Sequence, residues 1–317
     1  MQPRTKTHVF AFMALAIILA GHATLRSAGP LAIASATYEE VRDWAQLPPN
    51  TKWGEVAWVD IDATGLVYAF QRADRDTKAP ANVLVFNADG RFLRSMAREV
   101  FRDPHGLRIL RDGAIWATDR RMHQIFKLDS EGRVLFSLGK KDVAGDMTST
   151  DAFNGPADVA MAENGELFIA DGEGPNTRIV KLSKDGTFIK MWGAKGAEPG
   201  QFQTPHCVVT DSRGRIWVCD RGNKRVQIFD RDGKFLEQST EFGAPAAIYI
   251  TKDNTVYVAA GAPDSSVTIA TLDGKVTDRI TGLQESPHAL AVASDGTIYV
   301  ASANQGRGNL VKLVKKK

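Results

Sequence analysis

Three histidines in this chain share one local sequence pattern. His105 in DPHGLRIL, His206 in TPHCVVTD and His288 in SPHALAVA each follow a proline and precede a short hydrophobic run. Three neutral imidazoles around one point bind zinc and leave a fourth position open, as in catalytic rather than structural zinc sites. A histidine at the start of a strand can instead be a structural residue whose ring is satisfied by hydrogen bonds. The fold decides between the two interpretations, because it determines whether the three histidine side chains lie close together.

The Pro-His segments are copies of a longer repeat. Each unit has Pro-X, a short apolar strand, an Asp-Gly-type turn and a second apolar strand, and two further strands follow. The units begin near Val56, Pro104, Pro156, Pro205, Pro245 and Pro287. Four short strands repeated about every 40 to 50 residues are typical of the blades of a β-propeller. The sequence therefore predicts an all-β, six-bladed β-propeller as a single domain over residues 29–317.

Closure of the ring needs a strand from elsewhere in the chain. The sixth unit ends at Lys317 before a fourth strand, and residues 37–48 (TYEEVRDWAQLP) are expected to supply it. In a propeller the first strand of each blade lines the central channel. The position after the repeat proline holds histidine in units two, four and six, and alternate blades of such a ring point inward about 120° apart. We therefore predict a metal site formed by His105, His206 and His288, whereas His123, before a third strand, is expected to be structural.

Residues 1–28 have the layout of a secretory signal peptide. Arg4 and Lys6 precede an apolar core from about Val9 to Ala20, and small residues follow. An uncleaved anchor is the alternative. With the signal removed, we expect no membrane span and a secreted or periplasmic, extracytoplasmic protein. The formal net charge of +3 is small and the basic residues are dispersed, which argues against nucleic acid as a partner.

The cysteines Cys207 and Cys219 flank the segment VVTDSRGRIWV. A hairpin centred on Arg213 would place them opposite each other on adjacent strands, where side chains come close enough for a disulfide. Export would favour that bond. Two buried thiols that fill a sheet are the other interpretation.

A known family becomes recognisable in these repeats. The runs DPHGL…WATDRRMHQIFKLD, GPADVAMAENGELFIADG and GQFQTPHCVV…VCDRGNKRVQIFD resemble the NHL-repeat propeller of peptidyl-α-hydroxyglycine α-amidating lyase. The resemblance runs from about Val56 to the C-terminus, and the three Pro-His pairs are its most specific part. It implies zinc held by His105, His206 and His288. It also implies cleavage of a C-terminal α-hydroxyglycine into a peptide amide and glyoxylate, hence a small peptide or hemiaminal-type substrate.

The same resemblance assigns further site residues. In that family an arginine at the end of the first blade's second strand lines the active site, and Arg72 in FQRAD matches it. Arg72 would hold the substrate carboxylate through a bidentate contact, or it is a surface arginine in a polar loop. Glu173 stands where the family has a tyrosine thought to share in proton transfer. It can act as a base, be a loop residue, or be a fourth metal ligand.

The calcium site of the family is altered in this chain. Backbone carbonyls such as those of Val59 and Leu107 would line it, but Ala289 replaces the aspartate that helps to bind the ion. Losing a hard anionic ligand weakens calcium binding. In addition, Ser286 stands where the family has a methionine.

Other functions stay open at this stage. A non-enzymatic extracytoplasmic propeller would use its channel mouth or rim to bind a peptide, a glycan or a protein partner. Lactonase-type propellers build a calcium site from Glu, Asn and Asp at channel positions where this chain has histidines. Propeller lyases that open cyclic depsipeptides also use a histidine near a divalent ion. A fold alone does not choose among these functions.

Overall fold

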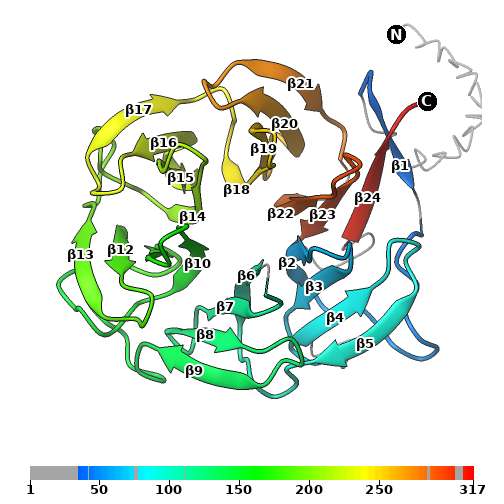
Figure 1. Ribbon diagram of the computed structural model, residues 1–317, viewed down its shortest axis with the longest axis horizontal. Helices are drawn as coiled ribbons and strands as arrows, with labels where there is room; N and C mark the ends of the chain where they lie inside the picture. The colour runs from blue at the N-terminus through cyan, green and yellow to red at the C-terminus, as the bar shows by residue number, and fades with distance from the viewer. Residues whose placement is uncertain (1–34, 42, 75–77, 111, 284–285, 304–309) are drawn as a thin grey trace, which may run out of the picture. The chain divides into compact units, whose positions relative to one another are not determined.

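The computed structural model describes residues 35–41, 43–74, 78–110, 112–283, 286–303 and 310–317, and the predicted signal peptide lies outside them. Within these ranges the chain forms strands β1 to β24 and one short 3-10 helix, η1 (Arg221–Asn223). The strands form six sheets of four strands each. The sheets are arranged around a common centre, which Figure 1 shows as a ring of blades. The predicted all-β, six-bladed β-propeller is confirmed.

The bounds of the strands follow the repeat closely. Blade 1 contains β2 (Val56–Ile61), β3 (Val67–Gln71), β4 (Asn82–Phe86) and β5 (Phe92–Met96). Blade 2 contains β6 (Pro104–Ile109), β7 (Ile115–Asp119), β8 (Gln124–Leu128) and β9 (Val134–Leu138). Blade 3 contains β10 (Pro156–Met161), β11 (Leu167–Asp171), β12 (Arg178–Leu182) and β13 (Phe188–Trp192). Blade 4 contains β14 (Pro205–Thr210), β15 (Ile216–Asp220), β16 (Arg225–Phe229) and β17 (Phe235–Ser239). Blade 5 contains β18 (Pro245–Ile250), β19 (Thr255–Ala260), β20 (Ser266–Thr271) and β21 (Val276–Ile280). Blade 6 contains β22 (Pro287–Val292), β23 (Ile298–Ser302), β24 (Leu310–Lys315) and β1 (Tyr38–Val41).

The ring is closed by strands from the two ends of the described chain. β1 pairs antiparallel with β24, with Tyr38 opposite Lys315 and Val41 opposite Lys312. β1 therefore forms the outer strand of the sheet that starts at β22 in the channel (Figure 1). It falls within the segment 37–48 to which the repeat pattern assigns ring closure. Backbone hydrogen bonds in one blade thus hold both ends of the ring together.

Burial explains why the inner and outer strands differ in sequence. β3 and β12 are buried at all five positions, because neighbouring blades pack on both of their faces. β17, at the outer edge, is half-buried only at its ends. The aromatics Trp116, Phe168 and Trp217 occupy equivalent second-strand positions and are at most 2% exposed. Burying each such ring stabilises the fold by roughly 2–3 kcal/mol, so the contacts between blades hold the ring in shape.

An aspartate at the end of the second strand fixes the loop that precedes the first strand of its own blade. The carboxylate of Asp119 accepts hydrogen bonds from the backbone N–H groups of Arg102 and Asp103, just before His105. In the same way Asp220 accepts from the N–H groups of Gln203 and Thr204, just before His206. These contacts anchor two of the Pro-His segments at their entry into the channel.

A bulge then directs the residue after the repeat proline. In blade 4 the pairing between the first two strands shifts between Pro205 and Cys207, so His206 has no register partner. The same shift occurs around His105 and around His288. Bulges re-aim side chains and often lie beside functional sites. The repeated bulge is therefore the local reason that these three residues share one orientation.

The hairpin of blade 4 carries the chain's two cysteines. Cys207 lies opposite Cys219 on β14 and β15, as the hairpin predicts, and the structure joins them in a disulfide. Of the two interpretations of the sequence, the structure contains the bonded one. Among the residues that the structure describes, no helix is long and apolar enough to span a bilayer.

Candidate metal site

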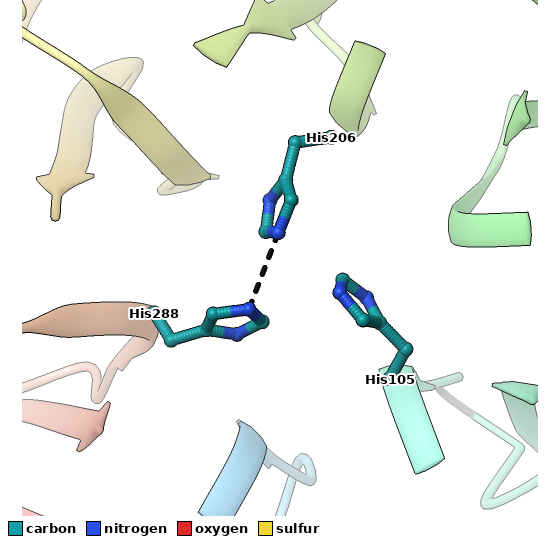
Figure 2. Close-up of side chains that lie close together, drawn as sticks. All are labelled: His105, His206 and His288. Atoms are coloured by element: carbon teal, nitrogen blue, oxygen red, sulfur yellow. Dashed lines mark hydrogen bonds between the residues drawn. The ribbon is translucent and has the colours of Figure 1, made fainter. Parts of the chain in front are cut away.

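The rings of His105, His206 and His288 converge at the centre of the channel (Figure 2). They come from the first strands of blades 2, 4 and 6, and their centroids are 4.7, 4.8 and 4.9 Å apart. One ligand atom from each lies within 4.8 Å of the others, and all three residues are buried. The convergence that the alternating pattern predicts is present in the structure.

The neighbouring blades fix the orientation of each ring. Nδ1 of His105 lies 2.8 Å from the carbonyl oxygen of Ala157. Nδ1 of His206 lies 2.6 Å from that of Ala246, and Nδ1 of His288 lies 2.7 Å from that of Ala57. A carbonyl oxygen only accepts hydrogen bonds, so each Nδ1 must carry the proton. In the neutral ring the lone pair is then on Nε2, the tautomer that binds a metal when a backbone carbonyl supports the ring.

The alanines that accept these bonds occupy the same repeat position as the histidines. Ala57, Ala157 and Ala246 are the residues of blades 1, 3 and 5 that correspond to His105, His206 and His288. Gly106 helps one carbonyl to come close, because a Cβ added at Gly106 would lie only 2.6 Å from the oxygen of Ala157. The hydroxyl of Thr118 donates to the same oxygen. Odd and even blades therefore have complementary roles, one set supplying rings and the other supplying acceptors.

The Nε2 atoms have the environment of metal ligands. Nε2 of His105 is buried without a hydrogen-bond partner among the described residues. Nε2 of His206 lies 3.2 Å from Nε2 of His288, although both carry lone pairs in the supported tautomer. Protonation of one ring would relieve the repulsion between the two lone pairs, but burial lowers the pKa of both His206 and His288 well below the usual value. A tetrahedral metal with zinc–nitrogen bonds of about 2.0–2.1 Å separates two ligand nitrogens by about 3.3 Å. These residues fit a metal ion that prefers imidazole.

Glu173 lies at the edge of the same site. Its carboxylate oxygens are each 3.6 Å from an Nε2 atom, Oε2 from that of His105 and Oε1 from that of His206. Arg120 donates to Oε2 at 3.1 Å and Arg221 donates to Oε1 at 2.7 Å. Burial opposes ionisation, but the guanidinium of Arg221, which donates to Oε1, favours the carboxylate and lowers the pKa of Glu173. Glu173 is therefore an anion, and its low pKa makes it a weak base.

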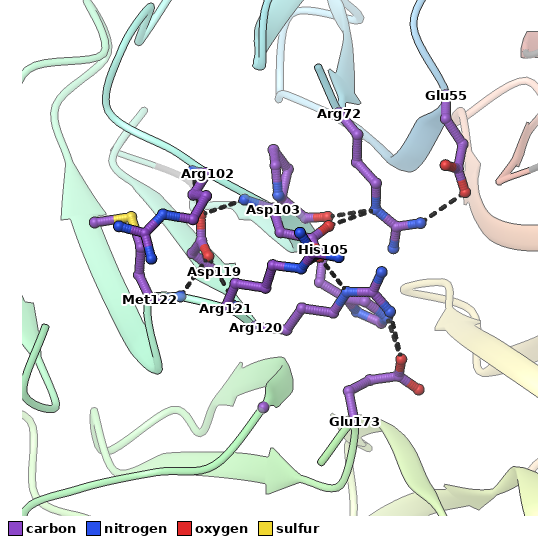
Figure 3. A network of polar contacts seen from close by, with 12 residues as sticks. Glu55, Arg72, Arg102, Asp103, His105, Asp119, Arg120, Arg121, Met122 and Glu173 are labelled. Carbon is purple, nitrogen blue, oxygen red and sulfur yellow. Dashed lines mark hydrogen bonds and ion pairs between the residues drawn. The ribbon is translucent and has the colours of Figure 1, made fainter. Parts of the chain in front are cut away.

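Arg72 lies in a chain of alternating charges that leads to Glu173 (Figure 3). Its guanidinium contacts Glu55 at 2.6 Å and Asp103 at 3.1 Å, and its side chain is 11% exposed. Asp103 also contacts Arg120 at 2.7 Å, and Arg120 continues to Glu173. The side chain is therefore mostly buried beside the segment that carries His105, and its positive charge is balanced by protein carboxylates.

Sequence reasoning missed two arginines of this network. Arg120 and Arg221 directly follow the second strands of blades 2 and 4, which is the position that Arg72 has in blade 1. The available signal was the repeated DR in WATDR and WVCDR, on two of the blades that carry histidine. The other residue not identified was Asp103, immediately before Pro104, which contacts Arg72, Arg120 and Arg121.

The channel offers few ligands for the calcium ion that the family resemblance implies, as the replacement by Ala289 predicts. Calcium takes six to eight oxygen ligands, usually with several carboxylates among them. Val59 and Leu107 are buried on first strands, but Ala289 offers no side-chain oxygen. The carboxylate of Asp158 is already paired with the guanidinium of Arg108 at 2.5 Å. The carboxylate of Asp60 accepts two backbone N–H groups, those of Ile61 and Ile109. The positive charge beside these carboxylates is the guanidinium of Arg108.

The structural role expected for His123 agrees with its contacts. His123 has a positive φ of 57° at the turn before β8, and its Nδ1 accepts the N–H of Gly155 in the next blade. It lies outside the group of three histidines that could hold a metal.

Comparison with known proteins places these features in a family. The NHL repeat model matches residues 101–128 and 202–229, which include His105 and His206. The chain is 35% identical to NHL repeat-containing protein 3 of Mus musculus over 279 residues, covering 80% of this chain and 79% of that protein. It is 30% identical to a probable peptidyl-α-hydroxyglycine α-amidating lyase of Caenorhabditis elegans over 308 residues, covering 86% and 87%. The chain belongs to this amidating lyase-like family of NHL-repeat propellers.

Two further matches show the extent of the likeness. Peptidyl-glycine α-amidating monooxygenase A of Xenopus laevis is 31% identical over 84% of this chain, but the chain spans only 32% of that protein's length. Among solved structures, virginiamycin B lyase from Staphylococcus aureus matches with a TM-score of 0.57 and 16% identity over 88% of each chain. At that identity the match supports the propeller fold alone.

Proposed function

We propose that this protein is a zinc-dependent lyase that cleaves the C–N bond of an α-hydroxyglycine-type hemiaminal to give an amide and glyoxylate. The observation that carries the proposal is the fixed tautomer of His105, His206 and His288. Each Nδ1–H is committed to a carbonyl of the next blade, so the three Nε2 lone pairs face a common point. The name of the nematode relative supplies the reaction class. Bound zinc would supply a Lewis acid for the hydroxyl oxygen of the substrate.

The residues at the channel mouth limit how such a substrate would bind. In the reaction the hydroxyl group loses its proton, the C–N bond breaks with its electron pair going to nitrogen, and nitrogen gains a proton. The glyoxylate half carries a carboxylate, for which a guanidinium is the best-matched partner. Arg72, Arg120 and Arg221 are candidates, and each is paired with a protein carboxylate. A substrate carboxylate would therefore bind by exchange with Glu55, Asp103 or Glu173.

The roles of Arg72 and Glu173 in catalysis stay predictions. Arg72 would hold the carboxylate after separating from Glu55. Glu173 would take the hydroxyl proton only poorly while Arg221 holds its pKa low. An Arg72→Lys variant tests the first role, because lysine keeps the charge and loses the bidentate contact. We expect it to raise KM for the hydroxyglycine peptide more than it lowers kcat.

The proposal is tested by metal content followed by an activity assay. Elemental mass spectrometry of protein purified without added metal should find about one zinc ion per chain. His206→Ala should lose it and His123→Ala should keep it. Glyoxylate release from a peptide ending in α-hydroxyglycine should then follow zinc content across the three proteins. Protein that contains no metal and takes up none from added zinc would rule the proposal out.

A non-enzymatic propeller that binds a peptide, glycan or protein partner is the second candidate. Arg72, Arg120 and Arg221 favour it, because each is already paired with a protein carboxylate and none of the three is held ready for an anionic substrate. Zinc that depends on His206, without glyoxylate release from any hydroxyglycine peptide, would support this role.

We also propose an extracytoplasmic location, secreted or periplasmic. The Cys207–Cys219 bond supports it, because disulfides persist in oxidising compartments. The predicted signal peptide points the same way. Protein from its source cells can be alkylated before reduction, so that only free thiols are modified, and analysed by mass spectrometry. Both cysteines should be found unmodified by the alkylating agent. The same measurement should find the chain shortened near residue 28.

A further inference from the structure

Glu173 is held rigidly above the three histidines. It lies in the loop after β11, and its backbone N–H donates to the carbonyl of Gly155 at 2.9 Å. The glycines on either side are packed against other backbone. A Cβ at Gly172 would lie 2.3 Å from the oxygen of Pro205, and one at Gly174 would lie 2.2 Å from the oxygen of Asn154. The backbone therefore has little freedom to move this carboxylate away from the site.

On the side of the histidines the carboxylate faces lone pairs instead of hydrogen-bond donors. Its oxygens are 3.6 Å from Nε2 of His105 and of His206, beyond hydrogen-bond distance. The protons of both rings are on Nδ1, at the backbone carbonyls. An anion beside two imidazole lone pairs is repelled unless a cation lies between them. In a tetrahedral zinc site one carboxylate oxygen lies about 3.3 Å from each histidine nitrogen. Here Oε2 is 3.6 Å from Nε2 of His105 and Oε1 is 3.6 Å from Nε2 of His206, so a metal would draw one of the two oxygens inward toward the point that the three rings share.

The two arginines do not occupy the whole carboxylate. Arg120 and Arg221 each bond one oxygen, at 3.1 and 2.7 Å. An ionised carboxylate has about four lone-pair sites, so the same oxygens can also reach a metal. The side chain is 9% exposed, and water therefore competes little for the remaining lone pairs.

We propose that Glu173 is the fourth ligand of the metal, which closes a three-histidine, one-carboxylate centre in the resting protein. This inference rests on the metal site of the proposed function. It adds that a substrate must gain access to a metal whose four positions are already filled. A substrate oxygen reaches the metal by displacing Glu173 or as a fifth ligand. Arg120 and Arg221 keep the displaced carboxylate paired, so displacement leaves no isolated buried charge.

Cobalt(II) in place of zinc tests this assignment by spectroscopy, without reference to activity. Wild type loaded with Co²⁺ should give a visible spectrum that does not change with pH between about 6 and 9 or with added acetate. Glu173→Ala should place water in the fourth position, and metal-bound water ionises near pH 7. Its spectrum should therefore change with pH and with acetate, and its zinc affinity should fall by about tenfold or more.

Glu55→Ala is the matched control. It removes a carboxylate from the same charged network, 2.6 Å from Arg72, and should leave the cobalt spectrum as in wild type. Circular dichroism and the unfolding temperature check that both variants fold. The fourth-ligand assignment would be overturned if the wild-type spectrum already responded to acetate and the Glu173→Ala spectrum were the same as that of wild type. The three-histidine metal site would be unaffected by that result. Failure of wild type to bind Co²⁺ through the histidines would instead remove the metal site and the proposed function with it.

Discussion

His206 and His288 place their Nε2 atoms 3.2 Å apart, although the Nδ1–H of each is already donated to a backbone carbonyl. Two imidazole lone pairs at that distance repel each other unless a proton or a metal lies between them. Burial disfavours the proton by lowering the pKa of both rings. The blades therefore hold the rings in an arrangement that a metal ion stabilises.

Metal removal should lower the stability of the protein, because it restores the repulsion between the Nε2 lone pairs of His206 and His288. A ligand that binds only the folded state stabilises it by about 2.7 kcal/mol at a free concentration of 100 times Kd. We expect a zinc-selective chelator to lower the unfolding temperature of wild type and of His123→Ala. His288→Ala should show no response to the chelator. An equal response in all three proteins, measured by scanning calorimetry, would speak against the site.

Gly106→Ala should weaken metal retention without touching a ligand. The new Cβ would lie 2.6 Å from the oxygen of Ala157, and this oxygen holds Nδ1 of His105. Loss of a supporting partner of a metal-bound histidine typically costs 10- to 100-fold in affinity. Competition with a chromogenic chelator measures the change. Gly113→Ala is the control, since its nearest neighbour would be the Cβ of Ser130 at 3.5 Å and its effect should be limited to stability.

The repeat made the fold and the three histidines predictable from sequence. Pro-X, the strand lengths and the turn residues recur, so the blades and their inward-facing positions follow from counting along the chain. The predicted starts of the six repeat units coincide with the first residues of β2, β6, β10, β14, β18 and β22. Opposition of Cys207 and Cys219 follows from the same register.

The charged network could not be predicted in the same way. It depends on long side chains that reach across blades, as Arg120 and Arg221 do in meeting at Glu173. Strand periodicity gives the direction of a Cβ atom but not the course of a guanidinium beyond it. The pairing of Arg72 with Glu55 and Asp103 has the same origin. The family pattern located Arg72 but carried no information about its partners.

Reduction of the disulfide should destabilise blade 4. Cys207 and Cys219 are 12 residues apart in sequence, and closing a loop of this size stabilises a protein by about 3 kcal/mol. We expect a reductant to lower the free energy of unfolding of wild type in urea. The double variant Cys207→Ala, Cys219→Ala should be less stable than wild type and indifferent to reductant. If wild type and the double variant unfold alike without reductant, the bond contributes nothing to stability.

Asp60 should make stability depend on pH in the acid range. Burial raises the pKa of Asp60 from 3.8 to about 6, in part against the attraction of Arg108. A carboxyl whose pKa is raised by folding favours the folded state below its unfolded pKa. That contribution is lost as the pH rises from about 4 to about 6. The shift corresponds to at most about 3 kcal/mol.

Asp60→Asn isolates this effect from the hydrogen bonds of the carboxylate. The amide loses one acceptor for the N–H groups of Ile61 and Ile109, a cost that does not vary with pH. The free energy of unfolding of wild type relative to the variant should therefore fall between pH 4 and 6 and be level above pH 7. A constant difference over the whole range would show that Asp60 does not titrate there.

Arg108 should hold the first strands together in the channel, where the family resemblance implies calcium. Its guanidinium pairs with Asp158 at 2.5 Å and lies 4.9 Å from the centre of the Trp58 ring, so it connects the first strands of blades 1, 2 and 3. Arg108→Met keeps most of the apolar stem but leaves the buried Asp158 unpaired, at a cost of about 3–5 kcal/mol. Adding Asp158→Asn should recover part of that loss, because the isolated charge is removed. Calcium and a calcium-selective chelator should both leave the unfolding temperature of wild type unchanged. A rise with calcium that persists in the double variant would show that the channel binds the ion through other oxygens.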